Sequence, residues 1–317
     1  MSKQLAPDLA SDRQGLVVFP DPGWDLNDAQ HSIDELVAEA WQYRTSAAYT
    51  ELLEFVARFR SYSPFNAMLV HVQLPGATFV APAHRWRSKF LRRIRPGARP
   101  LVILQPRGPV MFVYDVSDTE PEQGAPELPG GVQKPFEATM KRSVFDAMRQ
   151  TIANGRRDGV RVTFVPGGSQ RAGQIGEATP GLSMEFAGGR PPNVRVTNVP
   201  IRYELEINGG HEELVQFTTL IHELGHLYCG HIGMPEARWF WPDRRSLDEV
   251  TREFEAESVS YLVCKRLDPD ALLPPYLAGY VSKQSEVPYM SLMRVLTAAH
   301  EIEQMGKSRL PPRKPKL

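Results

Sequence analysis

One short motif constrains this chain more than any other feature: His222-Glu223-Leu224-Gly225-His226, inside the run Gln216–His231. Residues four apart lie one above the other on the same face of an α-helix. Two imidazoles placed in this way can hold one Zn²⁺, and Glu223, one step round the helix, can act on a water beside them. We therefore predict that His222 and His226 are metal ligands and that Glu223 is a catalytic base.

The residues around the motif predict a helix with one buried side. Apolar side chains recur mostly at helical spacing, namely Leu214, Phe217, Leu220, Ile221, Leu224 and Tyr228. Gly225 is a poor helix residue and costs about 1 kcal/mol relative to alanine. Its presence predicts that another backbone passes close to this helix.

A catalytic zinc site takes three protein ligands and keeps one position open. The third ligand has two candidates, Glu253 and Glu257, which lie four residues apart on a second predicted helix at 247–267. Glu255 points elsewhere on that helix, and the alternative for the whole run is a solvated acidic face. A donor for a reaction oxyanion cannot be chosen among His231, His211, Tyr261 and His300, and His231 could equally support a ligand or lie on the surface.

Composition excludes several classes of protein. The chain has 317 residues, 42% of them hydrophobic, which is enough for one or two cores, and 37 basic residues balance 37 acidic ones. Its two cysteines, Cys229 and Cys264, imply no disulfide framework, and buried thiols are favoured over Cys229 as a ligand. The N-terminus does not read as a signal peptide, and no run of about 18 apolar residues occurs. We expect a cytoplasmic protein with no membrane partner.

Charge is distributed unevenly despite the overall balance. Between Glu54 and Asp115 there are ten basic residues and no acidic one. Aromatic residues are interleaved among them: Phe59, Tyr62, Phe65, Phe79, Trp86, Phe90, Phe112 and Tyr114. Basic side chains that follow phosphates, together with aromatic rings on which bases stack, are typical of proteins that bind single-stranded nucleic acid. The alternative is a solvated basic face over an ordinary aromatic core.

Element patterns predict an α+β fold with two domains. We expect a disordered N-terminus at 1–23, a small α+β domain at 24–117, a Pro/Gly-rich linker at 118–135, a second domain at 136–306 and a disordered basic tail at 307–317. The predicted helices lie at 26–60 with a break near Thr45, and at 64–73, 136–154, 216–231, 247–267, 269–283 and 288–306. The predicted strands lie at 99–106, 110–116, 160–165, 174–177, 183–186 and 201–207.

The second half of the chain resembles a known family. Leu220–His231 and Arg252–Val263 are similar to the ImmA/IrrE group of zincin metallopeptidases, and closest to the C-terminal domain of ArdC-type antirestriction proteins. The resemblance implies a gluzincin-like zinc metalloendopeptidase in which helices surround a small, mostly antiparallel sheet. It implies that Glu253 is the third zinc ligand, that Glu257 is its neighbour, and that one Zn²⁺ is bound per chain.

The first half supports the same family. Ser63–Leu69, Gln73–Thr78, Trp86, Gly97–Pro106 and Val113–Thr119 resemble the domain of ArdC-like proteins that binds single-stranded DNA, so the resemblance covers most of residues 45–265. After Trp86 the chain departs from that family and is more basic. Together with the charge pattern, this predicts nucleic-acid contacts at Arg58, Arg60, Asn66, Arg85, Trp86, Arg87, Lys89, Arg92, Arg93 and Arg95.

Three functions follow as expectations. The first is a zinc endopeptidase recruited to single-stranded DNA, which cleaves a repressor or another DNA-associated or regulatory protein. The second is an antirestriction-like protein that binds single-stranded DNA and whose zinc site is structural or vestigial, and in either case non-proteolytic. The third is a stress-response regulator that acts through protein contacts. Glu223 favours the first, because a purely structural site has no need of it.

Overall fold

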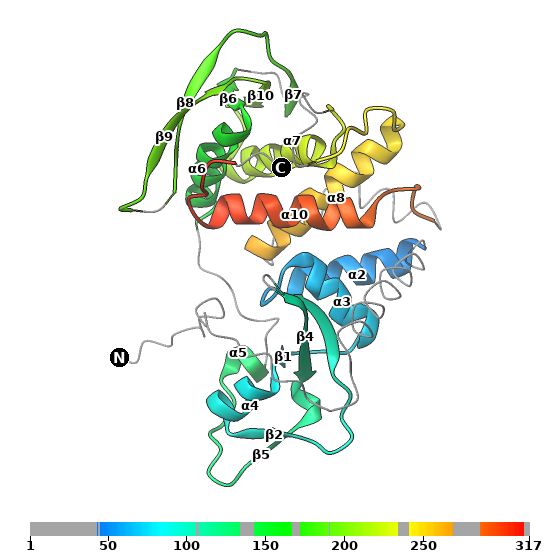
Figure 1. Cartoon of the computed structure of the whole chain (residues 1–317). Helices are drawn as coiled ribbons and strands as arrows, with labels where there is room; N and C mark the ends of the chain where they lie inside the picture. Colours follow the sequence, from blue (N-terminus) through cyan, green and yellow to red (C-terminus); the bar gives the residue numbers. More distant parts are fainter. Residues whose placement is uncertain are drawn as a thin grey trace. The chain divides into compact units, whose positions relative to one another are not determined.

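The protein divides into two compact units, Met1–Thr139 and Met140–Leu317, in a computed structural model (Figure 1). The described residues are 43, 45–105, 108–133, 143–166, 172–189, 191–233, 241–268 and 286–313. Both units combine helices with small sheets, so the predicted α+β class is confirmed. The predicted N-terminus, a helix before Thr45 and a helix at 269–283 lie outside the described residues.

Two capped helices open the described part of unit 1. Helix α2 (Ser46–Arg58) begins after Thr45, whose hydroxyl accepts a hydrogen bond from the Ala48 N–H at 3.3 Å. Helix α3 (Pro64–Gln73) begins after Ser63, whose hydroxyl accepts from the Asn66 N–H at 3.3 Å. A hydroxyl at the N-cap accepts from one of the free N–H groups of a helix start, and a proline at the first position, as in α3, removes another such N–H. The helix predicted at 64–73 is confirmed.

The sheet of unit 1 is a hairpin extended by a short strand. Strand β4 (Gly108–Asp115) pairs antiparallel with β3 (Leu101–Gln105) and with β1 (Val80–Ala81). This confirms the hairpin predicted from the two apolar runs. A separate pair joins β2 (Arg92–Ile94) to β5 (Thr119–Pro121), with the short 3₁₀ turn Val116–Asp118 before β5.

The predicted linker at 118–135 belongs instead to unit 1. Its first part forms β5, and Val132 of α5 (Gly130–Gln133) is fully buried against the cluster around Trp86. Trp86 lies on α4 (Ala83–Phe90). A three-residue strand and a single buried valine give no periodic signal, so the Pro/Gly content of the segment suggested a linker where the fold has an anchored loop.

Unit 2 contains a mixed sheet rather than a mostly antiparallel one. Strand β10 (Tyr203–Asn208) lies between β6 (Val160–Val165), which is parallel to it, and β7 (Gly173–Glu177), which is antiparallel. Strands β8 (Ser183–Gly188) and β9 (Arg195–Pro200) form a second, antiparallel hairpin. The 3₁₀ turn Arg156–Asp158 precedes β6. Strand β9 was not predicted, and its side chains are mostly exposed.

Within the described residues of unit 2, four helices pack together (Figure 1): α6 (Val144–Gly155), α7 (Glu213–Cys229), α8 (Glu249–Leu267) and α10 (Leu292–Lys307). Helix α8 begins two residues later than predicted, because Asp248 rather than Ser246 is its N-cap and accepts from the Thr251 N–H at 2.9 Å. Leu214, predicted to be buried, is exposed in the first turn of α7. No helix in the described ranges is long and apolar enough to cross a membrane.

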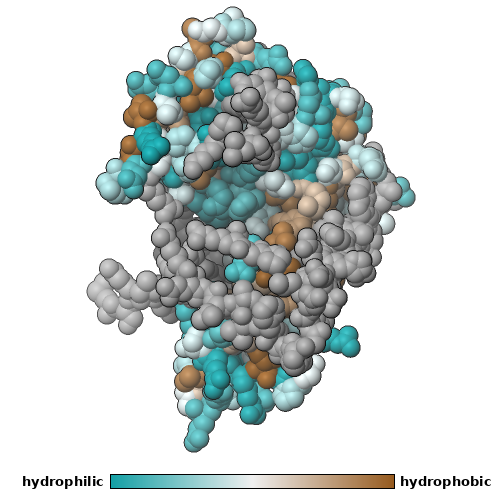
Figure 2. All heavy atoms as spheres, in the orientation of Figure 1, coloured by the Kyte–Doolittle hydropathy of each residue, from teal (hydrophilic) through white to brown (hydrophobic). Residues whose placement is uncertain are grey.

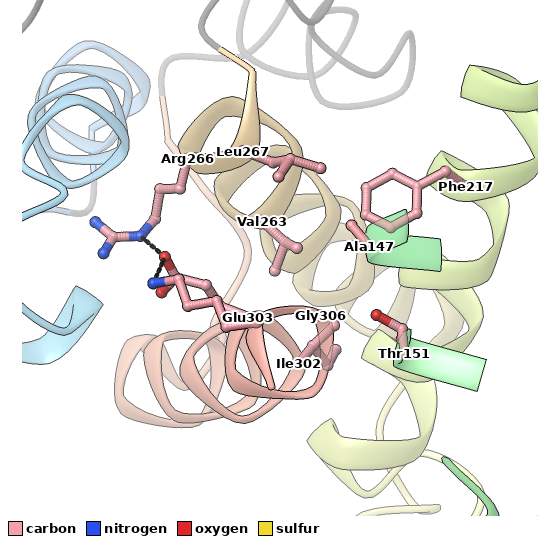
Figure 3. A pocket seen from close by; sticks show the side chains of 10 residues that line it. Ala147, Thr151, Phe217, Val263, Arg266, Leu267, Ile302, Glu303 and Gly306 are labelled. Carbon is pink, nitrogen blue, oxygen red and sulfur yellow. Dashed lines mark hydrogen bonds and ion pairs between the residues drawn. The ribbon is translucent and has the colours of Figure 1, made fainter. Parts of the chain in front are cut away.

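The four helices enclose a pocket of about 370 Å³, part of which is open to solvent (Figure 3). Apolar side chains such as Phe217, Val263 and Ile302 line one side of it. On the other side, Glu303 Oε1 lies 3.2 Å from Arg266 Nε in an ion pair and accepts a hydrogen bond from Lys307 Nζ at 2.7 Å. The buried carboxylate thus has two cationic partners within the pocket wall.

The predicted disordered tail is packed as far as residue 313. The Leu310 N–H donates to Asn154 Oδ1 at 3.0 Å, and the Leu310 carbonyl accepts from the Gly189 N–H at 3.0 Å. Arg313 binds the fully buried Asp158 through two hydrogen bonds, one of them from Nη2 to Oδ2 at 2.9 Å. Proline and basic residues suggested disorder, but the acidic partner lies 155 residues away in the sequence and could not be read from the tail.

Candidate metal centre

Helix α7 carries both histidines of the motif, and its end is defined by Gly230. This residue has a φ of 88° and its N–H caps the carbonyls of His226 and Leu227. A Cβ on Gly230 would lie 2.1 Å from the Pro242 carbonyl oxygen, so only glycine fits. The helix therefore ends at Cys229, three residues after His226.

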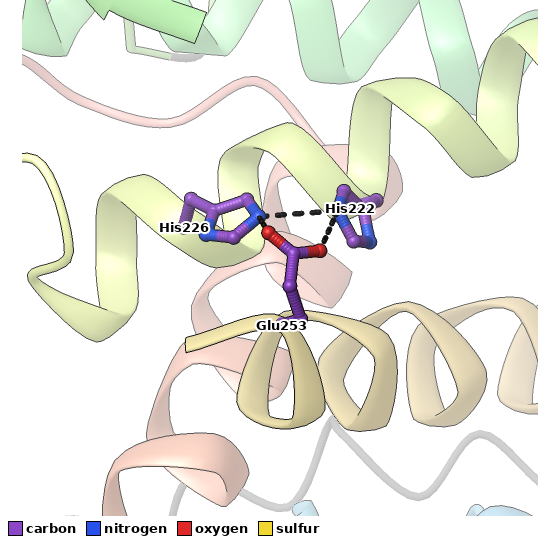
Figure 4. Close-up of side chains that lie close together, drawn as sticks. All are labelled: His222, His226 and Glu253. Atoms are coloured by element: carbon purple, nitrogen blue, oxygen red, sulfur yellow. Dashed lines mark hydrogen bonds and ion pairs between the residues drawn. The ribbon is translucent and has the colours of Figure 1, made fainter. Parts of the chain in front are cut away.

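Gly225 explains how the second helix comes close enough to supply a ligand. A Cβ on Gly225 would lie 3.2 Å from both the Cα and the carbonyl oxygen of Ala256 on α8. The sequence-based prediction that another backbone passes near this glycine is therefore confirmed. Close approach of α7 and α8 brings Glu253, one turn before Ala256, to the face that carries His222 and His226 (Figure 4).

The three side chains form one compact donor set. His222 Nε2 and His226 Nε2 are 3.1 Å apart. The Glu253 carboxylate lies 3.4 Å from His222 Nε2 through Oε2 and 3.4 Å from His226 Nε2 through Oε1. A tetrahedral zinc with bonds of about 2.0–2.1 Å keeps its ligand atoms about 3.3–3.4 Å apart. Donor types and spacing thus both fit a zinc ion held by two histidines and a carboxylate.

Protonation supports the same assignment. Hydrogen bonds to the two histidine rings hold the pKa of Glu253 well below its usual range, so its carboxylate is ionised. Burial lowers the pKa of His226, which favours the neutral ring that a metal requires. For His222, burial lowers the pKa, but hydrogen bonding to Glu253 and the charges of Glu257 and Glu223 outweigh it, and the pKa is raised. The His222 ring is therefore protonated more often than the His226 ring, and a metal ion that binds His222 more often has to displace a proton.

Glu223 lies between α7 and the sheet. It is buried, and its carboxylate accepts a hydrogen bond from the backbone N–H of Ile175 on β7. Burial raises its pKa, with the charge of His222 acting in the opposite direction. Helix and strand meet tightly here, because a Cβ on Gly173 would lie 2.6 Å from Thr219 Cγ2. The predicted base is thus held against the strand, beside the donor set.

The predicted supporting residues lie behind the two histidines. Glu257 Oε1 is 3.6 Å from His222 Nδ1, on the side of the ring opposite Nε2. His231 Nδ1 is 3.0 Å from His226 Nδ1, and His231 is buried rather than on the surface. Sequence reasoning set Glu255 aside, yet this fully buried carboxylate binds His231 Nε2 at 2.9 Å. Glu255 lies two residues from both Glu253 and Glu257 in the sequence, and this spacing did not indicate that its side chain is buried.

The four predicted candidates for an oxyanion donor have their described contacts away from the donor set. His231 is occupied behind His226, on the far side of that ring from Nε2. His211 contacts Asn208 at the end of β10, and the charged neighbours of His300 lie on α8 and α10 around Glu303. Tyr261 is eight residues beyond Glu253, about 12 Å further along the axis of α8. None of the four is brought to the donor set by these contacts.

Cys229 is not a ligand of this centre. It groups with His231 and Glu255, not with His222 and His226. Burial raises the pKa of its thiol well above the usual range, so it remains protonated. Cys229 and Cys264 are both buried free thiols, as predicted.

Two predicted nucleic-acid contacts have structural partners within unit 1. Trp86 is fully buried and donates from Nε1 to the Tyr114 carbonyl at 2.9 Å. Asn66 clamps β3, donating to the Leu104 carbonyl at 3.0 Å and accepting from the Leu104 N–H at 2.9 Å. The buried ring of Trp86 is not available to a base, and both amide atoms of Asn66 are engaged by Leu104. Most of the interleaved aromatic residues are buried in the same way, among them Phe59, Phe79, Phe90 and Tyr114.

The basic stretch contains no acidic residue in the sequence, but the fold brings acidic side chains from neighbouring segments next to it. Strand β5 follows Asp115 and brings Glu120 to β2, where it pairs with Arg93 at 2.9 Å. Asp118 acts electrostatically on Arg95, and Arg92 donates to the Thr119 hydroxyl at 2.7 Å. Arg58 is 3.8 Å from Glu54 on α2. Hydrogen bonding across β2 and β5 therefore partly neutralises the predicted patch.

An exposed basic surface nevertheless remains on α4 and β2. Its members are Arg87, Lys89, Arg93 and Arg95. Arg60, Arg85 and Arg92 are half-buried. The end of unit 1 formed by α4, β2 and β5 is mostly hydrophilic in Figure 2, with a few apolar side chains.

Comparison with known proteins leaves the family open. No family model and no curated protein matches the chain. Among solved structures, it is similar to the metal-free crystal structure of the antirestriction protein ArdC from plasmid R388, with 12% sequence identity and a TM-score of 0.29. That match covers 77% of this chain and 82% of the other. A TM-score this low indicates only a weak structural likeness, from which nothing is concluded about this chain. Membership of the ImmA/IrrE group therefore stays a prediction.

Proposed function

We propose that unit 2 is a zinc-dependent endopeptidase and that unit 1 recruits it to single-stranded DNA, where it cleaves a DNA-bound or regulatory protein. The observation that supports peptidase activity most is the position of Glu223. It is a buried carboxylate directly beside two histidines and a glutamate with the spacing of zinc ligands. A structural site needs the three ligands but has no use for this fourth group.

His222, His226 and Glu253 would hold the ion. Zinc bound in such a site lowers the pKa of a water towards neutrality and polarises a carbonyl oxygen. Glu223 takes the proton of the attacking water and later passes it to the leaving amine. Burial raises the pKa of Glu223, so its carboxylate is a stronger base than an exposed glutamate. The Ile175 N–H holds that carboxylate in place.

The edge of β7 that faces away from β10, beside Glu223, favours a peptide as the substrate. In an antiparallel pair, hydrogen-bonded and non-hydrogen-bonded residue pairs alternate. The Asn208 N–H donates to the Ala172 carbonyl and the Ala178 N–H to the Arg202 carbonyl, so even-numbered residues of β7 face β10. The odd-numbered residues Gly173, Ile175 and Glu177 therefore direct their N–H and C=O groups away from β10, and the Ile175 N–H donates to Glu223.

Among the described strands, β7 pairs with β10 alone. An extended peptide can add to such an edge through main-chain hydrogen bonds. A chain docked there would pass beside Glu223 and the donor set. This supports hydrolysis of a peptide bond within an extended segment, and it gives no preference for particular side chains.

The deciding experiment compares wild-type protein with Glu223→Gln. Zinc content would be measured by atomic emission after dialysis, and cleavage of unfolded casein by mass spectrometry. We expect Glu223→Gln to keep zinc and to lose cleavage by at least about 10²-fold, as for loss of a general base. Glu213→Gln, an exposed change in the first turn of α7, is the matched control and should behave as wild type. Equal cleavage by Glu223→Gln would reject the peptidase.

The antirestriction-like alternative, in which the metal is structural and the protein acts by binding DNA, is favoured by the exposed basic surface on α4 and β2. Single-stranded DNA would bind it mainly through phosphate contacts, so affinity should fall steeply with salt. We expect the double variant Arg87→Glu, Lys89→Glu to weaken binding to a labelled oligothymidine at least tenfold. Arg195→Glu, exposed on β9, is the control. Binding that ignores both salt and the double variant would remove DNA from the proposal.

Two free thiols suit a reducing compartment, and we propose a cytoplasmic location on that ground.

A further inference from the structure

A chain of hydrogen bonds leads from His226 into the interior of unit 2. His226 Nδ1 is 3.0 Å from His231 Nδ1, and His231 Nε2 is 2.9 Å from Glu255 Oε2. The side chains of His231 and Glu255 are 1% and 0% exposed. A polar group this deeply buried is costly unless it is fully hydrogen-bonded, so the arrangement calls for a specific role.

The chain is fixed at its inner end. Arg244 donates to Glu255 from Nη1 at 2.6 Å and from Nη2 at 2.7 Å, a bidentate pair. The Ser291 N–H, at the start of α10, donates to the same carboxylate at 2.7 Å. Arg244 also donates to the Cys229 carbonyl at 3.1 Å. Glu255 thus ties together the end of α7, the loop before α8, and α10.

A second metal site at this place does not fit the contacts. Cys229, His231 and Glu255 lie close enough together to suggest one. However, the guanidinium of Arg244 already occupies both oxygens of Glu255, and a cation beside it would meet its charge. The thiol of Cys229 is also held protonated by burial, whereas a metal needs the thiolate. The cluster is therefore a hydrogen-bonded support.

The positions of the hydrogens follow from this geometry. If Nε2 of a neutral His226 binds a metal, its single proton is on Nδ1, which must donate. His231 Nδ1 must then accept, so the proton of His231 is on Nε2 and is donated to Glu255. The Glu255 carboxylate can only accept, because Arg244 and Ser291 supply further donors to it. Every bond in the chain has one possible direction.

We propose that His231, Glu255 and Arg244 are positioning residues for His226: they fix its tautomer and the orientation of its ring, so that Nε2 is presented to the ion. This rests on the metal site proposed above. Partners that hold a histidine ligand from behind typically change metal affinity by about 10–100-fold when removed. In most such sites a carboxylate or carbonyl contacts the ligand histidine directly, whereas here His231 lies between His226 and the carboxylate of Glu255.

The test measures the zinc dissociation constant of the full chain by competition with a chelating dye. We expect His231→Leu to bind zinc 10–100-fold more weakly than wild type. His231→Gln should recover most of that loss, since an amide also offers one acceptor and one donor side by side. His71→Leu, which removes a buried imidazole from unit 1, is the matched control and should bind as wild type.

Nitrogen-15 NMR of histidine-labelled, zinc-loaded wild type tests the same inference without a substitution, in case His231→Leu fails to fold. We expect a proton on Nδ1 of His226 and on Nε2 of His231. The opposite tautomer at His231, or unchanged zinc affinity in a folded His231→Leu, would overturn the inference and leave the metal site standing. Wild type that binds no zinc would instead reject the metal site itself.

Discussion

Gly225 of α7 lies against Ala256 of α8 at a distance where even a Cβ would be in tighter than ordinary contact. A Cβ on Gly225 would stand 3.2 Å from the Ala256 Cα and from its carbonyl oxygen. Two metal-ligand candidates lie on one of these helices and the third on the other, one turn from the contact. The distance between the two histidines on α7 and Glu253 on α8 therefore depends on Gly225, which is not itself a candidate ligand.

Gly225→Val should separate the helices. The larger side chain would push the Ala256 backbone away, and overpacking of this kind costs about 1–3 kcal/mol. We expect a lower free energy of unfolding in urea and weaker zinc binding, because Glu253 moves with α8. Gly76→Val, at a position with open space around its Cβ, should leave zinc affinity unchanged. Zinc affinity unaffected by Gly225→Val would show that the ligands do not depend on this contact.

Removing the cation that covers Asp158 should destabilise unit 2. Arg313 pairs with this fully buried carboxylate, whose Oδ2 also accepts from the Tyr228 hydroxyl at 2.7 Å. Arg313→Ala leaves Asp158 with the longer contact to Arg157, whose Nε lies 3.4 Å from Oδ2, so the loss should stay below the cost of a fully uncompensated buried charge, about 3–5 kcal/mol. Chemical denaturation would measure the loss. Arg309→Ala, an exposed change in the same segment, should cost less than about 0.5 kcal/mol.

The buried ion pair at Glu303 should make stability depend on pH. Burial alone would raise the pKa of Glu303, but the charges of Arg266 and Lys307 outweigh it, and the pKa is lowered. Its contribution is therefore present above the ordinary value of 4.5 and is lost as the pH falls through the folded-state pKa.

Glu303→Gln should cost about 3 kcal/mol at pH 7, because the buried Arg266 keeps its charge and loses the carboxylate that pairs with it. The difference from wild type should shrink below pH 4.5, where Glu303 starts to be protonated in the unfolded chain. Urea unfolding at pH 7 and at acid pH gives both values. A difference that stays constant with pH would show that the carboxylate is not ionised in the fold.

Asp115 organises the start of the sheet in unit 1. Its Oδ2 accepts from the N–H groups of Thr78 at 2.8 Å and Phe79 at 3.0 Å, and its Oδ1 from Ser117 at 3.0 Å. Asp115→Ala leaves these donors unpaired at a buried position, at about 1–3 kcal/mol for each group that water cannot reach. We expect a loss of at least about 2 kcal/mol by denaturation, with zinc content unchanged. Asp146→Ala, exposed on α6, is the control.

Local patterns predicted much of this molecule correctly. Capping residues located α3, apolar runs located the β3–β4 hairpin and β6, and a glycine inside the motif indicated the close passage of α8. These features depend on neighbours in the sequence, which is why they could be read there. Helical spacing alone also placed His222 above His226, and the same spacing marked Glu253 and Glu257 as sharing a face.

Pairings between distant residues could not be predicted in this way. The charge of the basic stretch looked uninterrupted because Glu120 follows it in the chain, whereas β5 places Glu120 directly on Arg93. Trp86 looked available to a base because nothing near it in the sequence showed that Val132 and Tyr114 would enclose it. Arg313 looked disordered because Asp158 lies far away along the chain.

The candidate metal centre divides in the same way. The sequence by itself determined the types of candidate ligand, the position of Glu223, and two candidates for the third ligand. Only the tertiary structure decided that Glu253 lies at both Nε2 atoms while Glu257 lies behind His222, and that Glu255 is buried at the end of a chain through His231. The physical reason is that helical periodicity sets which face a residue occupies, whereas the packing of α7 on α8 sets what that face meets.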